Sequence, residues 1–413
     1  MWSDNPENLL SEQLPGAGSS LRIAVVTETY PPEVNGVALT VSRFIEGLRK
    51  RNHDIHLLRP RQSQMESADD SPNFREVLMR GLPIPRYPGL KMGLPARRSI
   101  ERLWTLHRPD LVHIVTEGPL GWSALQASIK LRIPVCSDFR TNFHAYSQHY
   151  GMGWLTKPIA AYLRKFHNRT MLTMVPTETM RASLTGMGFR NLRVVARGVD
   201  TRLFNQARRS QALRQAWGAA PDDPVIIHVG RLAAEKNLDV LVAAHARMRK
   251  AAPRTRLVFV GDGPLRNSIA ARCPDAIFCG VRKGEDLAAH YASGDIFLFP
   301  SVTETFGNVT VEAMASGLAV VAYDYAAAAA HIGHGHSGLL PAYDNQQEFI
   351  RMSAQLVEDP GMIRSLGSRA CQTAASLDWD KVVQELEQIF RTVAMHRSGT
   401  ANGMDAALPG TAA

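Results

Sequence analysis

The chain has 413 residues, 45% of them hydrophobic and 21% charged, which suits two domains of about 200 residues rather than one core and excludes wholesale disorder. No apolar run approaches the roughly 18 residues that a membrane-spanning helix needs, and the four cysteines form no CxxC pair, which excludes a ribbon-type zinc site and a disulfide scaffold. The net charge of +9 lies in the first half, because residues 1–205 hold 27 basic and 17 acidic side chains whereas residues 206–413 hold 20 and 21.

The predicted elements of the first half alternate between strands and helices. Residues 1–20 lack the basic and apolar regions of a signal peptide and are expected to be disordered, which together with the cysteine usage favours a cytoplasmic protein. The apolar run at 22–27 predicts a buried parallel strand, and the loop after it leads into a helix over 39–50. Further strands are predicted at 55–58, 110–115 and 134–137, with helical patterns between them such as 123–131.

The second half restarts the same alternation. It predicts strands at 224–229, 256–260, 276–279, 296–299 and 319–322, and helices at 238–250, 265–272, 286–292 and 309–316. The fold class is therefore α/β, with two doubly wound Rossmann-like halves. The polar stretch 205–221 is expected to link them, a last helix is expected over 380–396, and the tail 397–413 is expected to be disordered.

Basic residues concentrate in two stretches of the first half, Arg86–Arg102 and Lys157–Arg169. The second stretch alternates basic with apolar residues and predicts an amphipathic helix with a cationic edge. That edge is typical either of a solvated helix face or of a helix that docks on an anionic membrane surface. No nucleic-acid-binding motif accompanies the charge, so nucleic acid is not expected as a partner.

The chemistry concentrates in the segment 301–317, which follows the predicted strand 296–299. Parallel sheets bind ligands beyond the carboxyl ends of their strands. The turn Phe306-Gly307-Asn308 offers backbone N–H groups at the positive end of the next helix, which predicts an anion site. Two carboxylates beside a phosphate site, Glu304 and Glu312, need other partners, and sugar hydroxyls are suitable donors.

Cationic and glycine-containing loops follow two other strands of this half. Arg231 and Lys236 follow the strand 224–229 and are placed to neutralise a diphosphate leaving group. The turn that begins Gly261-Asp262 is typical of a backbone that approaches a nucleotide. Asp262 and Arg282 are candidate contacts for the base.

Three patterns that imitate other sites are set aside. The GxGxxG match at 333–338 is not followed by a helix, so dinucleotide binding is not expected there. His331, His334 and His336 indicate a solvated loop rather than a metal site. Asp378-Trp379-Asp380 precedes the last helix and predicts its N-cap. No metal and no cofactor are expected.

Together these motifs resemble the retaining glycosyltransferases of family 4, which have the two-domain GT-B architecture. The resemblance spans about Arg22–Arg391 and rests on Glu304-x7-Glu312, Gly230-Arg231 with Lys236-Asn237, the turn at Gly261, Arg197-Gly198-Val199-Asp200 and the Asn35-Gly36-Val37 loop. The first half is most similar to GDP-mannose-dependent mannosyltransferases and sulfoquinovosyl-diacylglycerol synthases, through segments such as YPGLKMGLP and TNFHAYSQHYG.

The resemblance implies a role for each motif. Arg231, Lys236 and the backbone of Phe306–Asn308 would bind the donor diphosphate, Glu304 the hexose hydroxyls and Glu312 the ribose diol. Gly36 would approach the donor from the other domain. The domains would be an acceptor-binding domain over 21–204, a nucleotide-sugar-binding domain over 205–379 and a helix over 380–396 that returns to the first domain.

Arg140 departs from the family pattern, which usually has a histidine there, near the reacting carbon of the sugar. Arginine cannot act as a base, because its pKa is about 12 or higher, although it can orient a hydroxyl or stabilise phosphate charge. His144 and His113 are the candidates to supply the missing polar contact. Arg140, His144 and His113 therefore join Glu304 as candidate catalytic residues.

The expected activity is retaining transfer of a hexose, with mannose favoured, from a nucleotide-diphosphate sugar to a hydroxyl of a lipid or glycan. GDP-mannose is favoured over a UDP-sugar as donor. The expected location is the cytoplasm, with the inner face of the membrane as a candidate docking surface. The alternatives are a nucleotide-sugar epimerase or hydrolase, a UDP-sugar-dependent glycolipid synthase and a non-catalytic nucleotide-sugar-binding protein.

Overall fold

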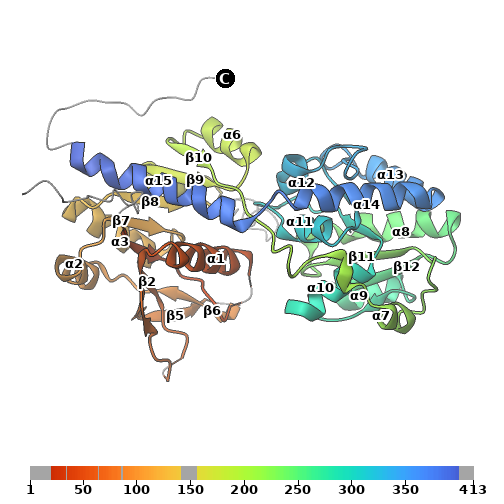
Figure 1. Cartoon of the computed structure of the whole chain (residues 1–413), viewed down its shortest axis with the longest axis horizontal. Helices are drawn as coiled ribbons and strands as arrows, with labels where there is room; N and C mark the ends of the chain where they lie inside the picture. Colours follow the sequence, from red (N-terminus) through yellow and green to blue (C-terminus); the bar gives the residue numbers. More distant parts are fainter. Residues whose placement is uncertain (1–19, 34, 64, 85–86, 141–155, 400–413) are drawn as a thin grey trace, which may run out of the picture.

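The structure, a computed structural model, describes residues 20–33, 35–63, 65–84, 87–140 and 156–399. The chain forms two α/β units, each built around its own parallel sheet, and the last helix leads from the second unit across the first (Figure 1). The tails predicted to be disordered lie almost wholly outside the described residues.

The first sheet has eight strands in the order β10-β9-β8-β7-β1-β2-β4-β3. Its strands are parallel except for the β3–β4 pair. The bounds are β1 Arg22–Val26, β2 Asp54–Pro60, β3 Asp70–Ser71, β4 Phe74–Met79, β7 Leu111–Ile114, β8 Val135–Asp138, β9 Leu172–Val175 and β10 Leu192–Val194, with a separate hairpin of β5 Gly81–Ile84 and β6 Tyr87–Gly93. Its helices are α1 Gly36–Lys50, α2 Arg97–Leu106, α3 Pro119–Leu131, α5 Thr156–His167 and α6 Glu178–Gly186.

The second sheet has five parallel strands in the order β13-β12-β11-β14-β15. Their bounds are β11 Val225–Val229, β12 Arg256–Val260, β13 Ile277–Phe278, β14 Ile296–Phe299 and β15 Ala319–Ala322. The helices are α7 Gln211–Ala216, α8 Leu238–Ala251, α9 Arg266–Arg272, α10 Gly284–Ser293, α11 Asn308–Ala315, α12 Ala326–His331, α13 Gln346–Glu358, α14 Pro360–Ala374 and α15 Trp379–Gly399, with short 3-10 helices at Gln206–Arg208 and Ala234–Lys236.

The predicted alternation is present in both halves. All five strands predicted for the second half occur with nearly the expected bounds, and both sheets carry apolar cores on their two faces, as buried parallel strands require. The predicted start of the first helix is wrong, because α1 begins at Gly36, capped by the Asn35 side chain, rather than at residue 39.

The last helix returns to the first domain, as predicted (Figure 1). Val383, Leu386 and Phe390 of α15 are buried in the same cluster as Val41 and Phe44 of α1. The two domains are therefore joined by this helix as well as by the chain that leads from β10 to β11.

Helices α1 and α15 meet at Gly47. A Cβ atom there would lie 2.6 Å from Cγ2 of Val383, so we expect Gly47→Ala to lower the free energy of unfolding by about 1–3 kcal/mol. Gly186→Ala in α6 is the control, because a Cβ there meets nothing within 4 Å. Urea unfolding of both variants measures the effect, and equal stability would show that the helix contact adapts without cost.

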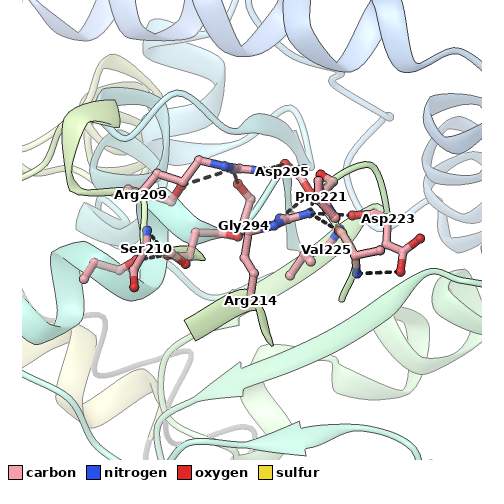
Figure 2. Close-up of polar contacts among 12 residues, drawn as sticks. Arg209, Ser210, Arg214, Pro221, Asp223, Val225, Gly294 and Asp295 are labelled. Carbon is pink, nitrogen blue, oxygen red and sulfur yellow. Dashed lines mark hydrogen bonds and ion pairs between the residues drawn. The ribbon is translucent and has the colours of Figure 1, made fainter. Parts of the chain in front are cut away.

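The segment predicted to be a linker packs against the second domain instead of spanning the gap between domains. Figure 2 shows the reason, which is the buried guanidinium of Arg214. It donates to the carbonyl oxygens of Pro221, Asp223 and Ser293 at 3.1, 2.8 and 3.0 Å and lies 3.0 Å from Oδ2 of Asp295. This network fixes the polar stretch to the end of α10 and to the start of β11.

Candidate functional site

The carboxyl ends of β11, β12 and β14 carry three loops that lie together at one sheet edge. The Gly230 N–H donates to the carbonyl of Val260 at 3.0 Å, and the Leu232 N–H donates to the carbonyl of Asp262 at 3.0 Å. A side chain at Gly261, where φ is +138°, would overlap the carbonyl oxygen of Gly230. The β11 and β12 loops therefore interlock closely, and glycine is required at this contact.

Lys236 and Glu304 form an ion pair across this edge. The Lys236 ammonium, from the β11 loop, donates to Oε1 of Glu304, from the β14 loop, and Ser301 Oγ donates to the same oxygen at 2.7 Å. Burial opposes ionisation of Glu304, but Lys236, Ser301 and the charge of Arg197 together hold its pKa below the ordinary value. Glu304 is thus a carboxylate that can accept hydrogen bonds from hydroxyls.

A pocket opens beside Glu304 beneath the start of α11. Gly307 precedes the helix with φ of +93°, and the buried Phe306 lies just before it. The Thr310 N–H donates to the carbonyl of Gly307 at 3.0 Å, and the N–H groups that precede it, at the positive end of the helix dipole, are placed to bind an anion. The pocket is lined by Phe299, Ser301, Glu304, Phe306, Thr310, Ala322, Tyr323, Tyr325, Ala326 and Ala328.

The other predicted donor contacts lie at the rim of the same edge. Arg231 is partly exposed, with Nη1 3.7 Å from Oε1 of Glu235. Asp262 is exposed and lies 3.2 Å from Arg266. Arg282 donates to the carbonyl of Cys279 at 2.9 Å and lies 3.2 Å from Asp286. These side chains are therefore at the sheet edge, each beside a protein partner.

Glu312 lies on the second turn of α11, because the helix begins at Asn308, one residue before the predicted start at 309. Its Oε2 accepts a hydrogen bond from the Tyr291 hydroxyl of α10 at 2.9 Å. Burial raises the pKa of Glu312 to about 7, although the hydrogen bond from Tyr291 opposes the shift.

This raised pKa predicts a pH dependence of stability. The folded protein keeps the Glu312 proton up to about pH 7, whereas the ordinary pKa is 4.5, so the free energy of unfolding falls by about 3 kcal/mol as pH rises through this window. We expect Glu312→Gln to remove the contribution of Glu312 to the pH dependence of the free energy of unfolding. The contribution of Glu28, whose pKa is also raised to about 7, should remain in this variant. Unfolding between pH 4.5 and 8 measures this, with the exposed Glu285→Gln as control.

If Glu312→Gln leaves the pH slope unchanged relative to the control, the carboxyl is ionised in the folded protein.

Gly36 brings the first domain to this site. It is the first residue of α1, and a Cβ atom there would lie 3.2 Å from Nη1 of Arg197 and 3.4 Å from Nδ2 of Asn308. Arg197 in turn donates to Oδ1 of Asn308 at 3.1 Å. The start of α1, the interdomain segment and the start of α11 therefore meet at one point of the cleft.

The candidate catalytic residues of the first domain surround Asp138, at the end of β8. Arg140 Nε donates to Oδ2 of Asp138 at 2.6 Å, and Nε2 of His113 lies 3.2 Å from the same oxygen. Burial opposes ionisation of Asp138, but the charge of Arg140 and the contacts with Arg140 and His113 outweigh it and hold the pKa of the Asp138 carboxyl well below the usual range. His113 and Arg140 are thus brought together, whereas His144 lies outside the described residues.

Four polar residues of this region were not predicted: Asp138, Arg197, Tyr291 and Ser301. Asp138 follows a buried strand in the motif Ser137-Asp138-Phe139-Arg140, so its position was a usable signal. Tyr291 is inside the apolar pattern of α10, and nothing in the sequence distinguishes it from a core residue.

The histidines at 331, 334 and 336 show no metal-ligand geometry, since among the described residues no group of three or more ligand side chains is placed to hold an ion. The main-chain N–H of Asp380 donates to Oδ1 of Asp378 at 2.9 Å, which agrees with the predicted N-cap of α15. None of the described helices is long and apolar enough to cross a membrane.

Comparison with known proteins matches each half of the chain to a glycosyltransferase family model. Residues 34–203 match the family model described as Glycosyltransferase Family 4, and residues 223–359 match the model described as Glycosyl transferases group 1. The chain is 30% identical to a GDP-mannose-dependent alpha-mannosyltransferase of Corynebacterium glutamicum over 90% of this chain and 89% of that protein. It is 32% identical to a sulfoquinovosyl transferase of Arabidopsis thaliana over 73% of this chain and 59% of that protein.

Among solved structures, a sucrose-phosphate synthase from Thermosynechococcus elongatus superimposes with a TM-score of 0.74 at 17% identity, covering 90% of this chain and 99% of that one. At this identity the match establishes the fold alone, which is GT-B. Combined with the family models and the relatives at 30% identity or more, it shows that the chain belongs to glycosyltransferase family 4 and is a hexosyltransferase.

Proposed function

We propose that the protein transfers mannose, with retention of configuration, from GDP-mannose to a hydroxyl of a lipid or glycan acceptor. The observation that carries the proposal is the Lys236–Glu304 ion pair at the start of α11, since it places a cation, a carboxylate and a helix N-terminus at one sheet edge. The printed names of relatives at about 30% identity support mannose and a lipid-type acceptor.

In the proposed reaction the acceptor hydroxyl attacks on the face from which the diphosphate leaves. Because no enzymic nucleophile is evident among the candidate residues, a diphosphate oxygen takes the acceptor proton. Arg231, Lys236 and the N-terminus of α11 stabilise the charge that develops on the leaving group. Glu304 holds the sugar hydroxyls, and Glu312 holds the ribose diol after losing its proton.

We propose that neither a metal nor a cofactor takes part, with GDP-mannose as a co-substrate only. Two side-chain cations and a helix N-terminus are the groups that would neutralise the diphosphate in its place. Transfer measured with excess chelator tests this, and we expect the rate to stay the same.

Donor and acceptor are tested with purified protein, labelled GDP-mannose or UDP-glucose, and a lipid extract. We expect labelled lipid from GDP-mannose at a rate at least about tenfold above that from UDP-glucose. Labelled free sugar as the main product would favour a nucleotide-sugar hydrolase, and label in lipid from UDP-glucose alone would favour a glycolipid synthase.

We also propose that the first domain docks on the anionic, cytoplasmic face of a membrane. Arg164 and Lys165 lie near the end of α5, where Leu163 and Phe166 are buried, so the charged side of this helix faces outward. The four free cysteines support a reducing compartment. We expect co-sedimentation with anionic liposomes that weakens with salt, and equal binding to neutral liposomes would contradict electrostatic docking.

A further inference from the structure

Two buried guanidinium groups lie in the cleft between the domains without full hydrogen bonding. Arg140 and Arg197 are only 2% and 4% exposed. Among the described residues, Nη1 of Arg140 and both Nε and Nη2 of Arg197 have no hydrogen-bond partner. Buried polar nitrogens are nearly always paired, so three unpaired donors on two neighbouring cations call for a ligand.

Among the described residues, no carboxylate is in hydrogen-bonding contact with Arg197. Its guanidinium lies 5.6 Å from the centre of the Phe306 ring, donates to the neutral side chain of Asn308 and adjoins Gly36. Burial first, and then the charge of Arg140, lower the pKa of Arg197 to about 9, while Asp138 and Glu304 oppose the shift. Arg197 is therefore a buried cation without a directly bonded carboxylate in the part of the chain that the structure describes.

Arg140 approaches the same region from the first domain. Its guanidinium lies 5.0 Å from the centre of the Phe44 ring of α1, two turns along the helix from Gly36. Asp138 neutralises it in part but also contacts His113, so the cluster of Asp138, Arg140 and Arg197 keeps an excess positive charge. A buried unpaired charge costs stability, and a ligand of opposite charge removes that cost.

The two arginines lie on different parts of the cleft. Arg140 follows β8 of the first domain, and Arg197 lies in the segment between the domains, next to the start of α11. Arg231 and Lys236, which we assign to the donor diphosphate, both come from the β11 loop of the second domain. An anion held by Arg140 and Arg197 would bridge the domains.

We propose that Arg140 and Arg197 together bind a compact oxyanion, such as a carboxylate, that belongs to a substrate and is distinct from the donor diphosphate. The guanidinium fork suits such a group because it can donate two parallel hydrogen bonds. With mannose as the transferred sugar, the acceptor carries the acid, whereas an acid on the transferred sugar would mean that a different sugar replaces mannose in the proposed function. This inference rests on the proposed function, since it assumes that the cleft binds a nucleotide sugar and an acceptor.

The test uses the full chain as wild type, Arg140→Gln and Arg197→Gln. Arg249→Gln is the matched control, because Arg249 is an exposed residue of α8 that pairs with Asp275. Arg140→Lys replaces Arg140→Gln if Asp138, left with His113 alone, prevents folding, and because lysine keeps the charge but not the guanidinium fork, this variant should lose the acidic preference in part. The donor arm measures Kd values for two pairs of a neutral and an acidic sugar nucleotide, which are GDP-mannose with GDP-mannuronate and UDP-glucose with UDP-glucuronate. It also measures Kd values for GDP and UDP alone as the reference for diphosphate binding. The acceptor arm measures kcat/KM for glucosyl-diacylglycerol against glucuronosyl-diacylglycerol.

We expect the wild type to prefer the acidic member of one pair by at least about tenfold, the size of a charge-assisted contact. The pair that shows the preference identifies the source of the acid. Both arginine variants should lose this preference and keep the affinity for GDP or UDP alone within about threefold, while the control keeps both.

The absence of an acidic preference in every pair would overturn the inference. An equal loss of affinity for GDP and UDP alone would also overturn it, because the arginines would then bind the diphosphate. A wild type that binds no nucleotide at all would contradict the proposed function itself and this inference with it, a result that the nucleotide-alone measurements identify separately.

Discussion

Replacing Lys236 with alanine is expected to lower kcat/KM for sugar transfer by about 100- to 1,000-fold, the usual effect of losing one group that stabilises developing charge. Lys236 contacts Glu304 directly, and its ammonium lies 5.4 Å from the centre of the Phe299 ring. The side chain is therefore held at the sheet edge where the diphosphate is proposed to bind. Initial rates with GDP-mannose and a lipid acceptor measure the loss.

Two comparisons make this prediction specific. Glu304→Ala should lower kcat/KM to a similar extent, and the double variant should lose less than the product of the two factors, because the residues contact one another. Arg249→Ala, at an exposed ion pair of the same domain, should keep the wild-type rate. Near wild-type activity in both single variants would show that the site lies elsewhere.

Arg214→Met is expected to lower the free energy of unfolding by about 3–5 kcal/mol, as is usual when one member of a buried ion pair is removed. The substitution keeps an apolar stem but leaves Asp295 with a weaker set of partners, and four carbonyl oxygens lose this donor, those of Ala220, Pro221, Asp223 and Ser293. Urea unfolding followed by circular dichroism measures the change.

Arg254→Met is the matched control for Arg214→Met. Arg254 pairs with the side chain of Asp223, whose carbonyl accepts from Arg214, but the Arg254 side chain is 72% exposed, so its loss should cost less than about 1 kcal/mol. If the two variants are equally stable, the Arg214 network is not what fixes the polar stretch to the second domain.

The fold could be predicted wherever the strands are buried on both faces. The run at 296–299 is apolar throughout, and the run at 224–229 is apolar except for His228. Each is followed by a helical pattern, so their assignment needed no tertiary information. The hairpin of β5 and β6 escaped prediction because proline and glycine interrupt both strands. The packing of the polar stretch escaped as well, because it depends on Arg214 reaching Asp295, about 80 residues away in sequence.

One part of the candidate site could likewise be predicted from the sequence, and another part could not. The approach of Lys236 to Glu304 follows from their places after neighbouring parallel strands, since β11 and β14 are adjacent in the sheet. The cluster around Arg197 does not follow from any such rule. It forms only when α1, β8 and α11 come together from both domains, and no spacing of residues in the sequence predicts that these three elements meet.

The most direct test of the central claim is a crystal structure of the protein with the nucleotide sugar that it binds most tightly. We predict the diphosphate within hydrogen-bonding distance of Lys236, Arg231 and the N–H groups at the start of α11, with hydroxyls of the sugar on Glu304. A diphosphate bound away from this sheet edge, or a Glu304 side chain that contacts no part of the donor, would contradict it.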